Sequence, residues 1–315
     1  MVINQANLDA MFQSFSTMFT EAYMGTPGPL LEQVGTRIPS NTRDQRYPFM
    51  QTISGAFRQW TGARVINNVV VDGFVVTNIK WEDTLSIERT DLEDDQYSIY
   101  ASMLIPNLAR NARILPDQQI ANIFNSNPIC YDSRTLFATN HYLDPQAKTG
   151  AQSNSLATKP LNAVNVALAQ AALMTLKGPD GIPLGSYGTT ILVPPSLQFA
   201  ALTVANASFY PEGKNGVSGT FGSQSNVWAG QFNVVVSEYL TDSGDPTTAV
   251  WYLLDNRSAS LRAALWQERE APQLVSLVDP ASSTVFFEDR YYMGGRARGA
   301  AAPGLWFKAI KVSGA

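Results

Sequence analysis

The side chains that most often perform catalysis are scarce in this chain of 315 residues. It contains one histidine, His141, and one cysteine, Cys130. A serine hydrolase would depend on His141 alone, and no GxSxG motif supplies a nucleophile. A single cysteine excludes an intrachain disulfide and a cysteine-rich zinc site. We therefore predict that the protein is not an enzyme and that Cys130 is a buried or bystander thiol.

Two other patterns resemble ligand sites but lack residues that such sites need. The acidic run at 91–95 could bind Mg²⁺ or Ca²⁺, yet it has no alternating ligands around a central glycine. It suits the beginning of a helix, where negative charge is favourable. The glycine-rich run at 216–222 has the wrong spacing for a phosphate loop, and no lysine follows it. We predict neither metal nor cofactor, and we expect a mobile loop over 206–230.

The composition indicates a protein whose surface is covered by partners. Charged residues make up 15% of the chain, against about 25% in ordinary soluble domains. A hydrophobic content of 45% supports a sizeable core. The 22 basic and 26 acidic residues give a net charge of −4, which offers no global footprint for nucleic acid. Arg296 and Arg298 are too few to hold nucleic acid, so we interpret them as contacts with other subunits or an acidic partner.

The sequence also predicts a soluble protein made in the cytoplasm. No basic residue precedes Arg37, and Asp9 interrupts the first apolar positions, so a secretory signal is not expected. The longest uncharged stretch, residues 181–211, is broken by prolines and is not a membrane span.

Residues 7–23 are predicted to form an amphipathic helix, because apolar side chains recur at helical spacing. Asn7 is the expected cap, and the glycines and prolines at 25–29 end the helix. The apolar face is rich in methionine and phenylalanine. It could pack on the core of its own chain or act as an arm that docks on a neighbouring subunit.

Charge is strongly polarised over residues 37–95. The segment 37–64 has a net charge of +4, and 65–95 has a net charge of −6. Between the charges lie strand-like runs at 65–71 and 74–79, separated by the turn pair Asp72–Gly73. We predict a long β-hairpin here, whose opposed charges pair either within the chain or between subunits.

The remaining pattern mixes helices and strands without regular alternation, which is typical of the α+β class. A long helix is predicted over 90–125, with a capping box at Thr90 and with Pro106 and Pro116, which should start, bend or divide it. The other predicted helices are 161–176 and 195–205. The other predicted strands are 189–193, 232–237, 249–254, 284–292 and 305–312.

Four stretches, in this order and spacing, resemble the major head subunits of Mu-like phages and prophages, whose fold is the HK97-type capsid fold. The first is the Phe-rich helix after Asn7, and the second is the acidic run at 91–95 followed by Tyr97 and Tyr100. The third and most distinctive is the block at 130–141, and the fourth is the closing segment at 295–306. A weaker match covers 226–236, and the resemblance runs nearly end to end.

The resemblance implies an α+β chain with five parts. Residues 1–40 would be an N-terminal arm, and 41–88 an extended E-loop hairpin that reaches across a neighbour. Residues 89–159 would form the P-domain with its spine helix, and 160–255 the A-domain. Residues 256–315 would return to the P-domain.

The function implied is a major capsid protein that self-assembles into pentamers and hexamers of an icosahedral shell around double-stranded DNA. The alternative is an encapsulin-like nanocompartment shell. Implied partners are copies of itself, a separate scaffolding protein, a portal, a decoration protein, and DNA held by weak non-specific contact. The location implied is the virion capsid, assembled in the bacterial host cytoplasm. The expected intersubunit contacts are Phe12, Phe15, Phe19, Arg43, Arg46, Arg58, Trp60, Arg64, Glu82, Asp83, Asp94, Asp95, Arg296 and Arg298.

Overall fold

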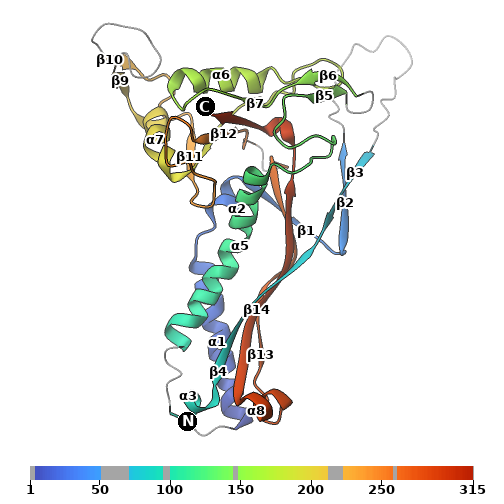
Figure 1. Cartoon of the computed structure of the whole chain (residues 1–315), viewed down its shortest axis with the longest axis vertical. Helices are drawn as coiled ribbons and strands as arrows, with labels where there is room; N and C mark the ends of the chain where they lie inside the picture. The colour runs from blue at the N-terminus through green and yellow to red at the C-terminus, as the bar shows by residue number, and fades with distance from the viewer. Residues whose placement is uncertain are drawn as a thin grey trace.

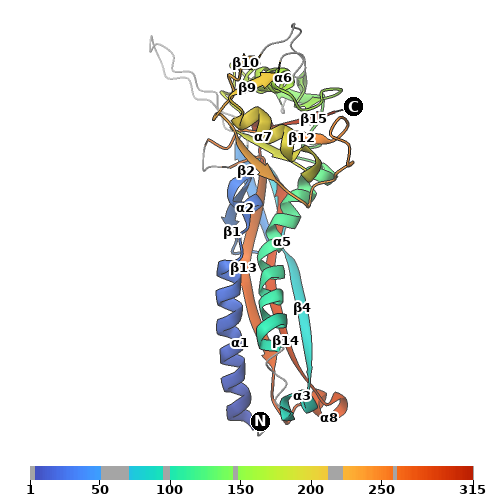
Figure 2. The same cartoon turned by 90° about the vertical axis from the view of Figure 1, so that its left-hand side faces the viewer.

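The molecule is elongated: a four-stranded sheet and two long helices run side by side along its long axis, and a five-stranded sheet lies at one end (Figures 1 and 2). The computed structural model describes residues 4–50, 71–94, 100–144, 148–211, 223–257 and 261–314. Its helices and strands confirm the predicted α+β class.

The four-stranded sheet runs along the long axis (Figure 1), with its strands in the order β1-β13-β14-β4. β1 runs parallel to β13, and the other neighbours are antiparallel. β13 and β14 have 14 residues each. β13 was not predicted, and the predicted strand at 284–292 covers only the first three residues of β14. The strands are β1 (Gly35–Pro39), β4 (Ile79–Glu88), β13 (Ala264–Leu277) and β14 (Arg290–Pro303).

Two long helices, α1 (Gln5–Gly25) and α5 (Ile105–Ser126), run along this sheet (Figure 2). The predicted first helix is confirmed, but its cap is Asn4, whose side chain accepts a hydrogen bond from the Asn7 amide at 2.8 Å. α1 buries its Met- and Phe-rich face against α5 and the sheet. The short α2 (Pro29–Gln33) then leads into β1.

The predicted helix over 90–125 is divided. α3 (Arg89–Glu93) ends before a π-helical turn (Tyr100–Leu104), and α5 follows with proline at its second residue. The capping box at Thr90 is wrong, because α3 begins at Arg89 and no side chain caps it. α5 contributes Leu108 to one hydrophobic core and Phe124 to another, so it connects the two ends of the molecule.

The five-stranded sheet at one end has its strands in the order β11-β8-β12-β15-β7. The predicted helices at 161–176 and 195–205 are confirmed as α6 (Ala163–Met174) and α7 (Gln198–Asn206), the latter after a 3₁₀ turn (Pro195–Leu197). The sheet strands are β7 (Ser155–Leu156), β8 (Thr190–Val193), β11 (Asn233–Val236), β12 (Val250–Leu254) and β15 (Ala309–Ser313). Two small antiparallel pairs are β5 (His141–Asp144) with β6 (Thr149–Gln152), and β9 (Phe209–Pro211) with β10 (Ser223–Ser225).

The predicted turn at Asp72–Gly73 is wrong. Both residues lie within β3 (Val71–Thr77), which pairs with β2 (Asp44–Met50) along its whole length. A partner strand therefore overrode a local turn signal. The predicted strand at 65–71 lies almost wholly outside the described residues.

The last third differs from the prediction in two places. Residues 284–292 are not one strand: α8 (Ser283–Glu288) precedes β14. At 305–312, a 3₁₀ turn (Trp306–Lys308) precedes β15. Of the closing strands, β14 joins the four-stranded sheet beside β4, and β15 pairs with β12 and β7.

Candidate subunit-contact surfaces

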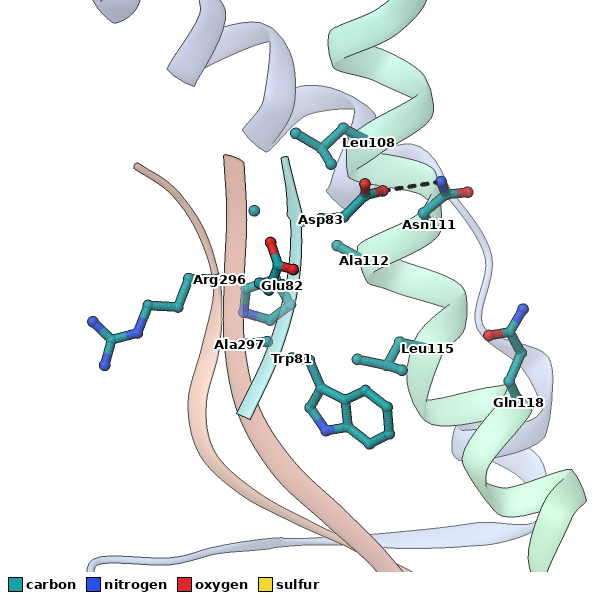
Figure 3. Close-up of a pocket in the computed structure, with 12 residues that line it drawn as sticks. Trp81, Glu82, Asp83, Leu108, Asn111, Ala112, Leu115, Gln118, Arg296 and Ala297 are labelled. Atoms are coloured by element: carbon teal, nitrogen blue, oxygen red, sulfur yellow. Dashed lines mark hydrogen bonds between the residues drawn. The ribbon is translucent and has the colours of Figure 1, made fainter. Parts of the chain in front are cut away.

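An apolar groove of about 120 Å³ lies between α5 and the four-stranded sheet. Trp81 and Leu115 face each other across it, as Figure 3 shows. The Trp81 indole donates a hydrogen bond to the Gly299 carbonyl at 2.9 Å, which fixes the ring on the sheet. Asp83 stands at the rim, where its carboxylate accepts a long, 3.4 Å hydrogen bond from Asn111. The groove therefore offers an apolar floor with an acidic edge.

The opposite face of the same sheet carries a row of charges. Because residues alternate between faces, the side chains of Trp81 and Asp83 share one face of β4 and that of Glu82 lies on the other, although Glu82 and Arg296 also line the groove. Arg296 lies directly opposite Glu82 in the β14–β4 register. Its guanidinium turns away from the groove (Figure 3) and pairs with Glu270 at 3.3 Å. Arg298 binds the same carboxylate at 2.9 Å, and this hydrogen bond lowers the pKa of Glu270.

The structure thus brings four predicted contact residues to one sheet, with Asp83 on one face and Glu82, Arg296 and Arg298 on the other. Sequence reasoning missed the apolar floor of the groove. Its residues come from elements that were predicted with other boundaries. The sequence therefore could not show that Trp81, Leu108 and Leu115 meet in one groove.

The other predicted contact residues are scattered. Arg43 and Arg46 are exposed beside the β2–β3 pair, and Asp94 is exposed after α3 at the opposite end of the sheet. Phe12 is half-buried against the core of α1 and α5. Arg58, Trp60, Arg64 and Asp95 lie outside the described residues.

Phe15 and Phe19 lie in the interior of the chain. They are 1% and 3% exposed and belong to the core that α1 shares with α5, β4 and β14. Buried side chains have no surface left for a neighbouring subunit in this conformation. The structure therefore supports the first of the two interpretations of this helix, packing on its own chain.

Two of the opposed charges of residues 37–95, one basic and one acidic, form ion pairs with the C-terminal strands. Arg37 pairs with Glu268 at 3.0 Å, and Glu88 pairs with Arg290 at 2.6 Å. These contacts join the first part of the chain to β13 and β14.

The single imidazole is buried in a polar network that fastens the 130–141 block to the end of the chain. His141 Nδ1 lies 2.6 Å from Asp132 Oδ2, and Nε2 lies 3.1 Å from Asn154 Oδ1. The ring stacks on Trp306 with centroids 4.1 Å apart. Asn154 donates to the carbonyls of Leu136 and Trp306. Both ring nitrogens are therefore occupied inside the chain.

The lone thiol is equally enclosed. Cys130 is 2% exposed, and its sulfur lies 3.2 Å from the Gly304 carbonyl oxygen. Burial raises the pKa of this thiol far above its usual range. Cys130 is therefore a structural residue, as a low pKa and exposure would be needed for reactivity.

Among the residues that the structure describes, His, Cys, Asp and Glu side chains form no group of three suited to a metal ion. Within the same ranges, no helix has the length and apolar character needed to cross a membrane.

Comparison with known sequences gives a family. The sequence profile of the Mu-like prophage major head subunit gpT matches residues 8–159, 152–240 and 241–314. The Mu-like prophage FluMu major head subunit of Haemophilus influenzae is 25% identical over 97% of this chain and 72% of its own length.

Comparison with solved structures agrees. The subunit in the procapsid of bacteriophage JBD30 is 26% identical, with a TM-score of 0.57 over 99% of this chain and 76% of that chain. An encapsulin from Synechococcus elongatus has a TM-score of 0.53 over 92% of this chain and 88% of its own, but at 10% identity the likeness concerns the fold alone. With a family profile that spans nearly the whole chain and a fold shared with phage capsids, the chain belongs to the Mu-like prophage major head subunits, and it is a major capsid protein with the HK97-type fold.

Proposed function

We propose that this protein self-assembles into pentamers and hexamers of an icosahedral shell that encloses double-stranded DNA. The observation that carries the proposal is the family match over nearly the whole chain. A charged fraction of 15% and two separate exposed surfaces on one sheet are consistent with extensive burial between copies. Assembly takes place in the cytoplasm of the bacterial host, with a scaffolding protein, a portal and a decoration protein as further partners.

The five-part division of the chain remains part of this proposal. Its A-domain corresponds to most of the five-stranded sheet, although β7 and β15 join that sheet from outside residues 160–255. Its P-domain corresponds to α5 with the four-stranded sheet. The E-loop corresponds to the β2–β3 pair and the segment between its strands.

We further propose that residues 51–70 of one copy occupy the groove of the next. β2 and β3 lead away from the groove towards the other end of the molecule (Figure 1), so a neighbouring copy must supply the occupant. The segment contains Arg58 and Arg64, two aromatic residues and no acidic residue. It therefore complements an apolar floor edged by Asp83.

A charge exchange tests this contact. R58E together with R64E should reduce shell formation at least about tenfold, while the unfolding midpoint of the free chain stays within about 2 °C. Adding D83R should restore part of the loss, because the new pair has opposite charges again. K148E together with K177E changes the net charge equally at exposed sites and serves as the control. Equal losses of soluble chain and of shells would contradict the proposal.

The shell itself is tested by light scattering and negative-stain microscopy of the purified chain, alone and with the scaffolding protein. Closed shells or rings are expected. A stable monomer in both samples would overturn the proposed assembly. The observation behind the encapsulin-like alternative is the fold shared with an encapsulin. This alternative predicts particles that enclose protein cargo. The nucleic-acid content and density of purified particles separate the two.

A further inference from the structure

One buried glutamine fastens both strands of the β2–β3 pair to the four-stranded sheet. Gln267 is 0% exposed, and its backbone is held in β13 by pairing with Ile38 of β1 and Ala300 of β14. Its side chain accepts a hydrogen bond from the Tyr47 hydroxyl of β2 at 2.6 Å and donates one to the Val76 carbonyl of β3 at 3.4 Å. We call this arrangement of Gln267, Tyr47 and Val76 the Gln267 bridge.

The chemistry of the three groups fixes the direction of both hydrogen bonds. The Val76 carbonyl can only accept, so the amide nitrogen of Gln267 must face it. The amide oxygen then faces Tyr47, whose hydroxyl must donate. Burial raises the pKa of Tyr47 to about 12, so the hydroxyl keeps its proton at neutral pH. A single orientation of the Gln267 amide therefore holds β2 with its oxygen and β3 with its nitrogen.

The apolar contact around the bridge is small. Its buried members are Val76, Leu265, Ala300 and Ala302, of which two are alanines. Apolar burial has no preferred direction, whereas a hydrogen bond needs a defined distance and angle. The apolar contact thus holds the pair against the sheet, and the Gln267 bridge selects one orientation.

A second polar contact ties the two ends of the pair together. Asn78, which follows β3 directly, is buried. Its backbone amide donates to the Arg43 carbonyl at 2.9 Å, and its side chain donates to the Thr42 carbonyl at 2.8 Å and the Ser40 hydroxyl at 3.0 Å. These residues lead into β2, so the pair enters and leaves the sheet at one point. A pair held at one point can still swing, and the Gln267 bridge supplies the second point that stops it.

We propose that Gln267 is a positioning residue for assembly: through Tyr47 and Val76 it sets the direction of the β2–β3 pair in the free chain, before a neighbour binds. The pair extends towards the five-stranded sheet (Figure 1) and carries the segment proposed to occupy a neighbour's groove. A segment that is already aimed loses less conformational freedom on binding, so the contact is tighter.

The proposal rests on the proposed contact between residues 51–70 and the groove, but the two fail separately. The charge exchange described above tests the contact in shells. Distances within the free chain test the Gln267 bridge, because no neighbour is present there.

Distances between two spin labels measure the direction of the pair. The labels are placed at V75C and S86C, on exposed side chains of β3 and β4. Cys130 is 2% exposed and should not be labelled. Pulsed electron paramagnetic resonance of the free, doubly labelled chain should give one narrow distance distribution.

Two variants of the bridge should broaden that distribution. Y47F removes the donor and keeps the ring, and Q267M removes both hydrogen bonds and keeps the length of the side chain. Each should broaden the distribution about twofold or more, because the remaining apolar contact has no preferred direction. Y187F is the matched control, since it removes a tyrosine hydroxyl that donates to the Gln231 amide at 3.3 Å beside the five-stranded sheet. Equal widths in Y47F, Q267M and Y187F would overturn the proposal.

Assembly gives an independent readout. Y47F should raise the chain concentration needed for half-maximal shell formation about three- to tenfold over wild type, whereas Y187F should leave it unchanged. Both variants lose one tyrosine hydroxyl, so a general loss of stability would not separate them. Y47F shells that form at the same concentration as Y187F shells would overturn the positioning role. If wild-type shells do not form, only the proposed assembly fails, and the distance measurement still decides the role of Gln267.

Discussion

Asp255 shows how a single carboxylate holds together two parts of the chain. It lies at the end of β12 and is 2% exposed. Lys308 contacts it at 2.8 Å, Arg257 at 3.0 Å and the Tyr187 amide at 3.1 Å. Burial opposes its ionisation, but the hydrogen bonds from Arg257 and Lys308 outweigh this effect and lower the pKa from 3.8 to about 2.

This lowered pKa makes part of the stability dependent on pH. The folded state favours the carboxylate, so the contribution is present above pH ~4 and is lost as the pH falls towards ~2. D255N should cost about 3 kcal/mol at pH 7, because it leaves the lysine and arginine without a carboxylate. The cost should shrink by about 2 kcal/mol near pH 2. Denaturant unfolding at both pH values checks this, with the exposed D9N as control. An equal loss of stability in D255N at both pH values would contradict this prediction.

The buried network of His141 illustrates what residue patterns reveal and what they do not. The block at 130–141 stood out in the sequence, and Asp132 and His141 do meet in it. Asn154 and Trp306 complete the network from distant positions in the chain. No local spacing points to them, because only the tertiary fold brings the 3₁₀ turn that carries Trp306 beside this block.

At the scale of elements, the N-terminal helix is one whose packing partner could not be predicted from the sequence. Its apolar stripe fits an intrachain core and an intermolecular arm equally well. The structure buries Leu8, Met11, Phe15 and Phe19 against α5 and the sheet. The helix therefore contributes to the stability of the free chain.

Truncating one core side chain of this helix tests that assignment. F15A should destabilise the unassembled chain by about 3–5 kcal/mol, because it leaves a cavity in the core. S14A, at an exposed position one residue away, should have little effect. Urea unfolding of the free chain provides the measurement. Loss of shells without loss of free-chain stability would instead identify α1 as an arm on a neighbour.

The elements that sequence predicted correctly are those with local signals. The helices after residue 160 were found from their apolar periodicity and, for the second, its initial proline. The strand predicted at 284–292 failed because Val285, Phe286 and Phe287 have strand-type side chains, whereas the Ser282 cap selects a helix. β13 was not predicted, and β14 was predicted only at its first residues, because their pairing, not their composition, makes them strands.

For the contact surfaces, the charged residues could be predicted from the sequence, but the faces of the sheet on which they lie could not. Glu82 and Asp83 were predicted together, and the pleat of β4 puts them on opposite faces of the sheet. Phe286 and Phe287 were assigned to a strand, so their exposure on a short helix was not foreseen. Exposure is a property of the whole fold and leaves no signature in a short segment.

At the scale of the whole molecule, the proposed contact and the bridge that positions it respond differently to salt. The contact between residues 51–70 and the groove depends on opposite charges, and the Gln267 bridge consists of uncharged groups. Screening shortens the Debye length from about 10 Å at 0.1 M salt to about 3 Å at 1 M. Salt should therefore weaken the contact and leave the bridge intact.

Light scattering at increasing NaCl measures this difference. The concentration of chain needed for wild-type assembly should rise with salt. In R58E with R64E, any residual assembly should no longer weaken as salt rises, because the attraction has been removed. Y47F should keep the wild-type dependence, because it changes no charge. Identical salt dependence in all three would contradict the division into a charged contact and an uncharged bridge.

The strand order has a consequence for synthesis on the ribosome. β15 lies between β12 and β7, and β14 lies between β13 and β4. Each sheet thus receives an interior strand that is translated after all the other strands of that sheet. A nascent polypeptide cannot complete either sheet before this, and the groove is unfinished until then. Neighbouring nascent chains on one message therefore cannot polymerise through this surface until these strands have been translated.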